Sequence, residues 1–286
     1  MPWTNYHSHS HFCDGVAPPE DHILAAIEKG FLAFGCSSHA YVPFEQSWSI
    51  KEERLPEYAP EILRLKEKYA DQIEVYLSLE VDYIPGMIGP NETKKEFGLD
   101  YTVGSVHFAD RWENGMPWGI DGTREEFTSG IEKLFDQSPQ KAVSRYYEVI
   151  RQMLEEDCPD ILGHMDKVKM HNSKGGIFEE TEKWYREAVM ATLETAGSTD
   201  VIIELNTRGI YKKKSFEPYP SRWILEEIYK MGIPLMINSD SHHPREIDEN
   251  FSDCAKILRE IGFRELRILL DGEWQDRAFN ERGFLK

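Results

Sequence analysis

Short segments of low charge alternate with longer amphipathic segments along most of this chain, and the alternation limits the folds available to it. Most short segments read as buried strands, and the longer ones repeat apolar residues at helical spacing. We predict strands at residues 3–6, 32–36, 74–79, 101–106, 161–163, 201–205 and 234–238, with a late apolar run at 266–270. We predict helices at residues 19–29, 52–69, 139–156, 181–196, 221–231 and 246–261. Seven or eight such strand–helix units favour a closed α/β barrel with parallel strands.

Two further features refine this pattern. Gly30, Gly197, Gly232 and Gly262 each follow a predicted helix, where a terminating residue is commonly glycine. The least regular part, residues 108–131, is rich in Trp and Gly and follows a predicted strand. Active-site loops of a barrel belong in this position, so we expect the segment to help form a substrate pocket.

The charge balance narrows the range of partners. The 286 residues include 33 Lys and Arg against 51 Asp and Glu, a formal net charge of −18. A chain this acidic repels phosphate backbones and anionic membrane surfaces, so we expect neither nucleic acid nor a membrane as partner. With 40% hydrophobic residues the chain can build a sizeable core, which excludes a disordered protein.

Other signals concern the compartment and the number of domains. The four cysteines, at positions 13, 36, 158 and 254, form no CxxC pair, which is typical of reduced cytosolic thiols. The first residues have neither the basic nor the apolar region of a signal peptide, and no stretch reaches the roughly 18 apolar residues of a membrane span. We expect a cytoplasmic protein whose residues 1–286 form one domain.

Metal-ligand side chains come at or just after the ends of the predicted strands. In chain order they are His7, His9, His39, Glu80, His107, His164, Asp240 and His242. The carboxyl ends of parallel barrel strands converge on one face, so these side chains can meet although they come from both ends of the chain. A single His at a strand end is more often a packing residue. So many buried polar rings are costly without a shared partner, which favours a metal site.

Two short motifs support the same interpretation. His7-x-His9 places both imidazoles on one side of an extended segment, and Asp240-x-His242 repeats that spacing. Neutral imidazole favours Zn, Fe or Mn, and a carboxylate can bridge two ions. Asp14 precedes a glycine and could be either a ligand or a turn residue. The remaining histidines are expected to have packing roles: His11, His22, His171 and His243.

The order of these motifs resembles the PHP (polymerase and histidinol phosphatase) superfamily over residues 6–244. The motifs are His7-Ser-His9…Asp14-Gly15, Ser38-His39, Glu80-Val-Asp82, Gly104-Ser-Val-His107, Gly163-His164 and Asp240-Ser-His242. Others are similar to its histidinol-phosphatase branch, namely residues 80–86, 104–108, 161–166 and 204–207 with Tyr219-Pro-Ser221. The resemblance implies a distorted (β/α)7 TIM-like barrel with three divalent ions, Zn, Mn or Fe, at the C-terminal ends of its strands.

The resemblance also implies a ligand set. The first ion would take His7, His9, Glu80 and Asp240, and the second would take Glu80, His107 and His164, with Glu80 as the bridge. The third would take His39 and His242. Many relatives complete it with a histidine after a slightly longer loop, where this chain offers Asp14.

The activity implied is hydrolysis of L-histidinol phosphate, a step of histidine biosynthesis, by a hydroxide that bridges two metal ions and attacks phosphorus. Catalytic roles are expected for Asp240, Glu80 and His242. Arg208 follows the sixth strand and could clamp phosphate, or form a surface salt bridge. Lys169 resembles a basic position of the family, and a similar alternative applies to it. The run of three lysines at 212–214 is expected to be a solvated loop.

Other functions stay open on the sequence. One is a PHP phosphatase or phosphodiesterase for another small phosphate, including a nucleotide. Another is a metal-binding PHP domain without catalytic activity, against which the complete ligand set argues. Amide hydrolysis by a related barrel is disfavoured, because those sites usually carry a bridging lysine and none stands at a matching position.

Overall fold

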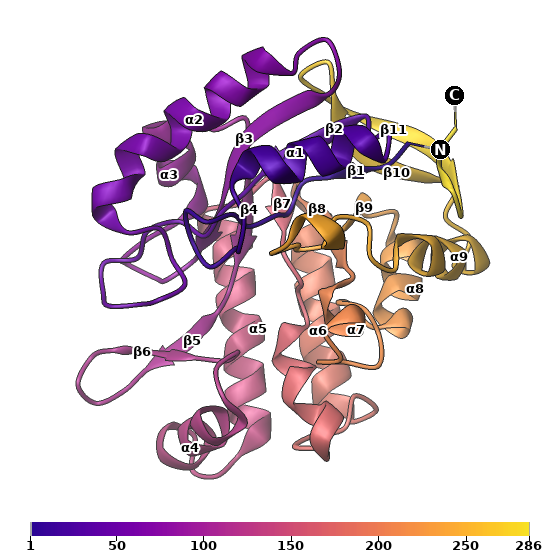
Figure 1. Ribbon diagram of the computed structural model, residues 1–286. Coiled ribbons are helices and arrows are strands. Elements are labelled where there is room, and N and C mark those ends of the chain that lie inside the picture. Colours follow the sequence, from indigo (N-terminus) through magenta and orange to yellow (C-terminus); the bar gives the residue numbers. More distant parts are fainter. Residues whose placement is uncertain (1, 286) are drawn as a thin grey trace.

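Seven parallel strands form the central sheet of the computed structural model, which describes residues 2–285 (Figure 1). They are β1 (Thr4–Asn5), β2 (Ala33–Cys36), β3 (Glu74–Asp82), β4 (Tyr101–Ser105), β7 (Ile161–Leu162), β8 (Ile202–Asn206) and β9 (Leu235–Asn238). Each pairs in parallel with the next in this order. The predicted TIM-like α/β arrangement of seven strands is confirmed.

The two outer strands of this sheet meet through side-chain amides and one parallel bridge between Ser8 and Ser241, without a regular ladder. The Asn5 Oδ1 atom accepts a hydrogen bond from the Ser239 backbone at 3.0 Å, and the Asn238 Oδ1 atom accepts one from the Tyr6 backbone at 2.8 Å. These amides take the place of backbone partners, so the barrel is nearly closed but distorted at the β1–β9 seam.

Six helices match the predicted ones and cover the outside of the sheet. They are α1 (Pro19–Glu28), α2 (Leu55–Lys68), α5 (Pro139–Glu156), α6 (Lys183–Gly197), α8 (Arg222–Met231) and α9 (Phe251–Ile261). Gly232 ends α8 with a φ of 67°, as predicted for a left-handed terminator. The prediction for Gly197 was wrong, because this residue is the last of α6 and Ser198 is its C-cap.

Shorter elements lie between these helices and strands. They are α3 (Pro90–Phe97), α4 (Arg124–Leu134), α7 (Arg208–Tyr211) and the 3-10 helices η1 (Glu52–Arg54), η2 (Lys167–Lys174) and η3 (Pro244–Glu246). In the part of the chain described, no helix is long and apolar enough to cross a membrane.

The late apolar run is not an eighth barrel strand. It forms β10 (Glu265–Leu270), which pairs antiparallel with β11 (Glu273–Asn280), and β11 pairs with β12 (Gly283–Phe284). This separate sheet, yellow in Figure 1, lies beside β1, where the Tyr6 hydroxyl donates to the Leu269 carbonyl at 2.7 Å. The run therefore packs against the barrel without joining its ring of strands.

The segment 108–131 is more ordered than its composition suggests. It forms a hairpin of β5 (Phe108–Arg111) and β6 (Pro117–Gly119), followed by α4. Thr123 and Glu126 form a reciprocal capping box that starts α4. Trp118 is buried and stacks on Phe127 with ring centroids 5.5 Å apart. The hairpin and α4 project from the barrel at the lower left of Figure 1.

Candidate metal centre

The ends of the barrel strands place the expected ligand side chains in one cluster. His7, His107 and His164 each lie two residues beyond a strand, and His39 lies three beyond β2. Glu80 differs from the prediction, since it lies inside β3. That strand extends to Asp82 because residues 80–82 pair with β4.

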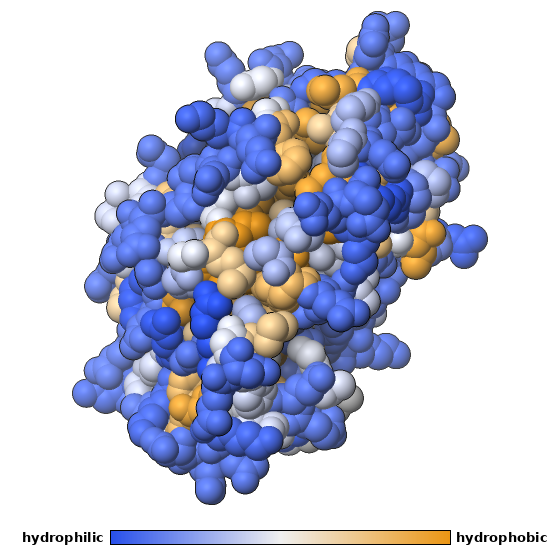
Figure 2. Space-filling model, turned by 90° about the vertical axis from the view of Figure 1, so that its left-hand side faces the viewer, coloured by the Kyte–Doolittle hydropathy of each residue, from blue (hydrophilic) through white to orange (hydrophobic). Residues whose placement is uncertain are grey.

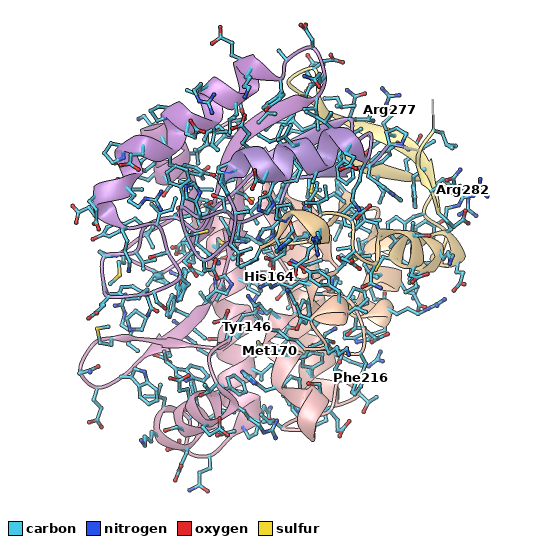
Figure 3. All side chains as sticks on the ribbon, viewed as in Figure 1. Tyr146, His164, Met170, Phe216, Arg277 and Arg282 are labelled. Atoms are coloured by element: carbon cyan, nitrogen blue, oxygen red, sulfur yellow. The ribbon has the colours of Figure 1, made fainter. Side chains whose placement is uncertain are left out.

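Glu80 is the centre of the cluster and is 1% exposed. Its Oε2 atom lies 3.0 Å from His39 Nδ1, 3.2 Å from His7 Nε2 and 3.4 Å from His9 Nε2. Its Oε1 atom lies 3.0 Å from His164 Nε2 and 3.7 Å from His107 Nε2. His164 lies in the interior of the molecule in Figure 3. One carboxylate thus faces imidazoles from four different strand ends.

Two further carboxylates complete the cluster. The Asp240 Oδ1 atom lies 3.2 Å from His9 Nε2 and 3.9 Å from His7 Nε2. The Asp14 Oδ1 atom lies 3.2 Å from His242 Nε2 and 3.9 Å from His39 Nε2. Every residue expected as a metal ligand is therefore brought into the cluster, Asp14 included.

The donors in this cluster fit divalent cations. The Nε2 atoms of His7 and His9 and the Nδ1 atom of His39 are buried and form no hydrogen bond. They face carboxylate oxygens, and mixed imidazole–carboxylate sets suit Zn, Mn or Fe. Four groups have ligand atoms within 4.8 Å of one another: His9–Asp14–His39–His242, His7–His9–Asp240, His7–Glu80–His164 and His39–Asp82–His107.

The carboxylates and imidazoles of the cluster shift one another's pKa values. Burial opposes ionisation of Glu80, but the imidazoles of His39 and His7 outweigh it and hold its pKa well below the usual value. Burial, together with His242 and His39, holds the pKa of His9 well below its usual value. The Glu80 carboxylate is therefore ionised and the His9 ring neutral. The buried carboxylates raise the pKa values of His7 and His39, whose protons a metal ion would displace.

Buried carboxylates contact the Nδ1 atoms of two of the imidazoles and so orient these rings. Glu204 Oε2 lies 2.7 Å from His7 Nδ1, and Asp82 Oδ1 lies 2.8 Å from His107 Nδ1. The Glu204 carboxylate also accepts hydrogen bonds from the side-chain amides of Asn206 and Asn238. Such partners fix the ring and the tautomer of a ligand histidine. Nothing in the sequence indicates these roles beyond the motifs that contain the two acids.

The backbone is strained at two of the cluster residues. His164 has a φ of 22° and Asp240 a φ of 52°, values that L-residues rarely adopt. Strain of this kind concentrates at functional sites, where the surrounding structure holds it in place.

Three basic side chains face the same cavity, which has a volume of about 340 Å³. Arg208 donates to the Asp240 carbonyl at 2.8 Å, so the structure places it at the cluster. Lys167 Nζ lies 3.1 Å from Asp121 and 2.9 Å from His107 Nε2. Lys214 also lines the cavity, so the lysine run is not wholly a solvated loop. Lys167, Lys214 and Asp121 were not among the expected site residues.

The structure does not bring Lys169 to this cavity. Its Nζ atom is buried, where it donates to the Pro218 carbonyl and the Ser221 hydroxyl and pairs with Asp166 at 2.8 Å. The expectation of phosphate binding is therefore corrected for Lys169, which holds the loop between β8 and α8. Lys167, two residues earlier, points into the cavity instead.

Comparisons with known proteins agree with this geometry. A family model described as "PHP domain" matches residues 5–208. The "Probable histidinol-phosphatase" of Deinococcus radiodurans is 26% identical over 264 residues, which cover 90% of this chain and 93% of that protein. The "Histidinol-phosphatase" of Lactococcus lactis is 25% identical over 269 residues, 92% of each chain.

A solved structure has the same fold. Histidinol phosphate phosphatase from Lactococcus lactis, complexed with Zn, L-histidinol and phosphate, superposes with a TM-score of 0.68. The match covers 99% of each chain at 21% identity.

Proposed function

The chain belongs to the PHP domain family, and from this premise we propose that it hydrolyses L-histidinol phosphate to L-histidinol and inorganic phosphate. The names of the relatives from Deinococcus radiodurans and Lactococcus lactis support this substrate. One observation carries the proposal: a cluster of metal-ligand side chains and three basic side chains line the same cavity. In a chain of net charge −18, that is a site for an anion.

We assign the ligands as the family resemblance implies, with Asp14 completing the third set. His7, His9, Glu80 and Asp240 would hold one divalent ion, Glu80, His107 and His164 a second, and Asp14, His39 and His242 a third. When bound, such ions lower the pKa of water towards about 7 and neutralise charge on phosphoryl oxygens. Glu80 can serve two ions because its two oxygens face different imidazoles.

The basic side chains hold the phosphoryl group in this mechanism. Lys167, Arg208 and Lys214 line the cavity, and the Arg208 guanidinium is fixed by its hydrogen bond to the Asp240 carbonyl. Charge-assisted hydrogen bonds to phosphate oxygens are about twice as strong as neutral ones. These side chains therefore orient the ester and stabilise charge that develops during attack on phosphorus.

Asp240 stays ionised and would orient the attacking water rather than donate a proton. Burial raises its pKa, but His7 and Arg208 outweigh burial and hold the pKa well below the usual value. Asn206 donates to the Asp240 Oδ2 atom at 3.2 Å and fixes the carboxylate plane. A carboxylate that stays ionised accepts a hydrogen bond from the attacking water and orients it towards phosphorus.

Amide hydrolysis through a carbamylated lysine is less favoured, because the Lys167 side chain at the cavity is held in an ion pair with Asp121 at 3.1 Å. Burial lowers the pKa of Lys167, but Asp121, Asp240 and Glu80 together raise it above the usual value, so the side chain remains an ammonium. We also propose that the protein acts in the cytoplasm on small phosphate esters.

A substrate panel tests the proposal. Protein loaded with Mn²⁺ or Zn²⁺ is given L-histidinol phosphate, other small phosphomonoesters and one phosphodiester, and phosphate release is measured. A kcat/KM above ~10⁴ M⁻¹s⁻¹ with a clear preference for L-histidinol phosphate is expected. Equal, slow release from every monoester would reject this substrate, and no release from metal-loaded protein would reject the enzyme.

A further inference from the structure

The short helix α7 follows β8 and carries Arg208 and Tyr211 three residues apart. Residues at this spacing lie on one face of a helix, and here both side chains reach the backbone just after β9. The Arg208 Nη1 atom donates to the Asp240 carbonyl at 2.8 Å. The Tyr211 hydroxyl lies 2.9 Å from the Ser239 carbonyl and 3.1 Å from that of Asp240. Among the described residues, Arg208 lines the cavity at the metal centre and Tyr211 does not, so any effect of Tyr211 on that cavity passes through its neighbours.

The Tyr211 hydroxyl connects Arg208 to the backbone of Ser239. A tyrosine hydroxyl has one hydrogen to donate and lone pairs with which to accept. The Ser239 carbonyl is the nearer of its two carbonyl acceptors, at 2.9 Å, so we assign the donated hydrogen there. The oxygen then accepts a hydrogen bond from Arg208 Nη1 at 3.4 Å. The Nη1 atom is thus held by two acceptors, the Tyr211 hydroxyl and the Asp240 carbonyl.

This hydroxyl lies against buried backbone. Most of the surface in Figure 2 is hydrophilic, with apolar residues gathered in its middle, so polar side chains there face water. The Tyr211 hydroxyl instead contacts Ser239 and Asp240, which are 0% and 4% exposed. A polar group in such surroundings needs hydrogen-bond partners, because an unpaired one costs free energy. Arg208 and the two carbonyls supply them.

The other side of the Arg208 guanidinium is available to a ligand. In the described part of the chain, no protein group forms a hydrogen bond with the Nη2 atom, and the Nε atom lies 4.0 Å from Asp240 Oδ1. The guanidinium is a rigid planar fork, so fixing Nη1 also limits the directions of Nη2 and Nε. A side chain that is already ordered loses less conformational entropy when it binds an anion.

We infer that Tyr211 is a positioning residue, whose hydroxyl holds the Arg208 guanidinium in the orientation that binds the phosphoryl group. Without the hydroxyl, Nη1 keeps only the Asp240 carbonyl, and the guanidinium can turn about that single hydrogen bond. The inference rests on the proposed function, since it takes phosphate-ester hydrolysis at the metal centre as given.

A double-mutant cycle tests whether Tyr211 acts through Arg208. Tyr211→Phe keeps the ring, which lies 5.4 Å from Lys212 Nζ, and removes only the hydroxyl. We expect Tyr211→Phe to lower kcat/KM for L-histidinol phosphate about fivefold. Binding of inorganic phosphate, measured by calorimetry on metal-loaded protein, should weaken by a similar factor. In an Arg208→Met background the same change should alter both values by less than about twofold, because the residue that the hydroxyl holds is gone.

Tyr229→Phe is the control for loss of a tyrosine hydroxyl. Tyr229 lies in α8, is 45% exposed and is not among the residues described as lining the cavity, so both values should stay unchanged. Metal content and the thermal unfolding midpoint show whether the site and the fold of each variant are intact. No loss from Tyr211→Phe, equal losses in the two backgrounds, or loss of bound metal would overturn the inference, since the last two results assign Tyr211 to general support of the loop after β9.

Failure of the proposed function gives a different result. Wild-type protein would then release no phosphate from L-histidinol phosphate, whereas the calorimetric cycle with inorganic phosphate would still show the coupling between Tyr211 and Arg208. Equal activity of the wild type and Tyr211→Phe on L-histidinol phosphate would instead reject only the role of Tyr211.

Discussion

The His7 Nδ1 atom lies 2.7 Å from the Glu204 Oε2 atom, although 197 residues separate them in the chain. His7 follows β1 and Glu204 lies in β8, so the contact crosses the barrel interior near the β1–β9 seam. The other side of the same imidazole faces Glu80 at 3.2 Å. Glu204 therefore directs the His7 Nε2 lone pair towards the metal centre.

Glu204→Gln should weaken metal binding while leaving the ligand set complete. Glutamine keeps the size of the side chain but loses the charge that fixes the His7 tautomer. Loss of such a partner typically costs 10–100-fold in metal affinity. Metal content after dialysis against a buffered chelator measures the effect, with Glu187→Gln on the exposed surface of α6 as control. Equal metal retention by the two variants would contradict the role of Glu204.

Glu80→Gln should cost far more activity than Arg208→Lys. Glu80 lies near five imidazoles and would be shared by two ions, so we expect its neutralisation to cost on the order of 10²–10³-fold or more. Arg208→Lys keeps the charge and loses only the bidentate geometry, a loss of about tenfold. Steady-state rates on L-histidinol phosphate compare them. Small and similar losses would refute the assigned roles.

Lys214→Gln should raise the inhibition constant of inorganic phosphate roughly tenfold, because a charged donor to the anion is lost. Lys213→Gln is the control, since Lys213 is exposed and does not line the cavity. A rise of similar size in the Lys213 variant would show that only net charge matters.

Phosphate binding should depend on pH through Lys214. Burial, together with Lys167 and Arg208, lowers the pKa of Lys214 below that of an ordinary lysine. As pH rises, Lys214 loses its proton before an exposed lysine does, so phosphate binding weakens on the alkaline side. Inhibition constants measured across alkaline pH should show less weakening in Lys214→Gln than in the wild type. Identical profiles in the two proteins would rule out this titration.

His22 should make the fold sensitive to acid. It is buried in α1, neither ring nitrogen forms a hydrogen bond, and burial lowers its pKa from 6.5 to about 3. Between these values the unfolded chain binds a proton that the folded chain does not, so stability falls as pH falls. From pH 7 to pH 5 the loss is about 2 kcal/mol. Urea unfolding of His22→Leu should show a loss smaller by that amount. The pKa of His11 is also lowered, but this side chain is exposed, so His11→Gln should reduce the loss by less.

Much of the fold could be predicted because its signals are local. Each barrel strand was predicted to within a few residues, since buried strands and amphipathic helices differ in the spacing of their apolar residues. The prediction ended the strand before Glu80, because a charged residue interrupts the apolar pattern there. In the structure Glu80 pairs with Val103, and this pairing extends β3 past the apolar run. The hairpin of β5 and β6 was missed because its order comes from tertiary contacts such as Trp118 with Phe127.

The candidate site was also predicted only where its residues follow from local sequence and strand order. Strand ends converge by topology, so the cluster from His7 to His242 followed from chain order alone. Lys167 and Lys169 could not be told apart, because which of them faces the cavity depends on the turn of η2 and on the pairing of Lys169 with Asp166. Lys214 was expected in solvent because its position depends on how the loop after α7 folds back over the cavity.

A metal titration tests the central claim most directly. Protein stripped by a chelator is titrated with Mn²⁺, and the initial rate of phosphate release from L-histidinol phosphate is followed together with bound metal per chain. The account predicts no release from stripped protein and a rate that rises with metal binding until the cluster is filled. Full metal occupancy without release, or release from stripped protein, would contradict it.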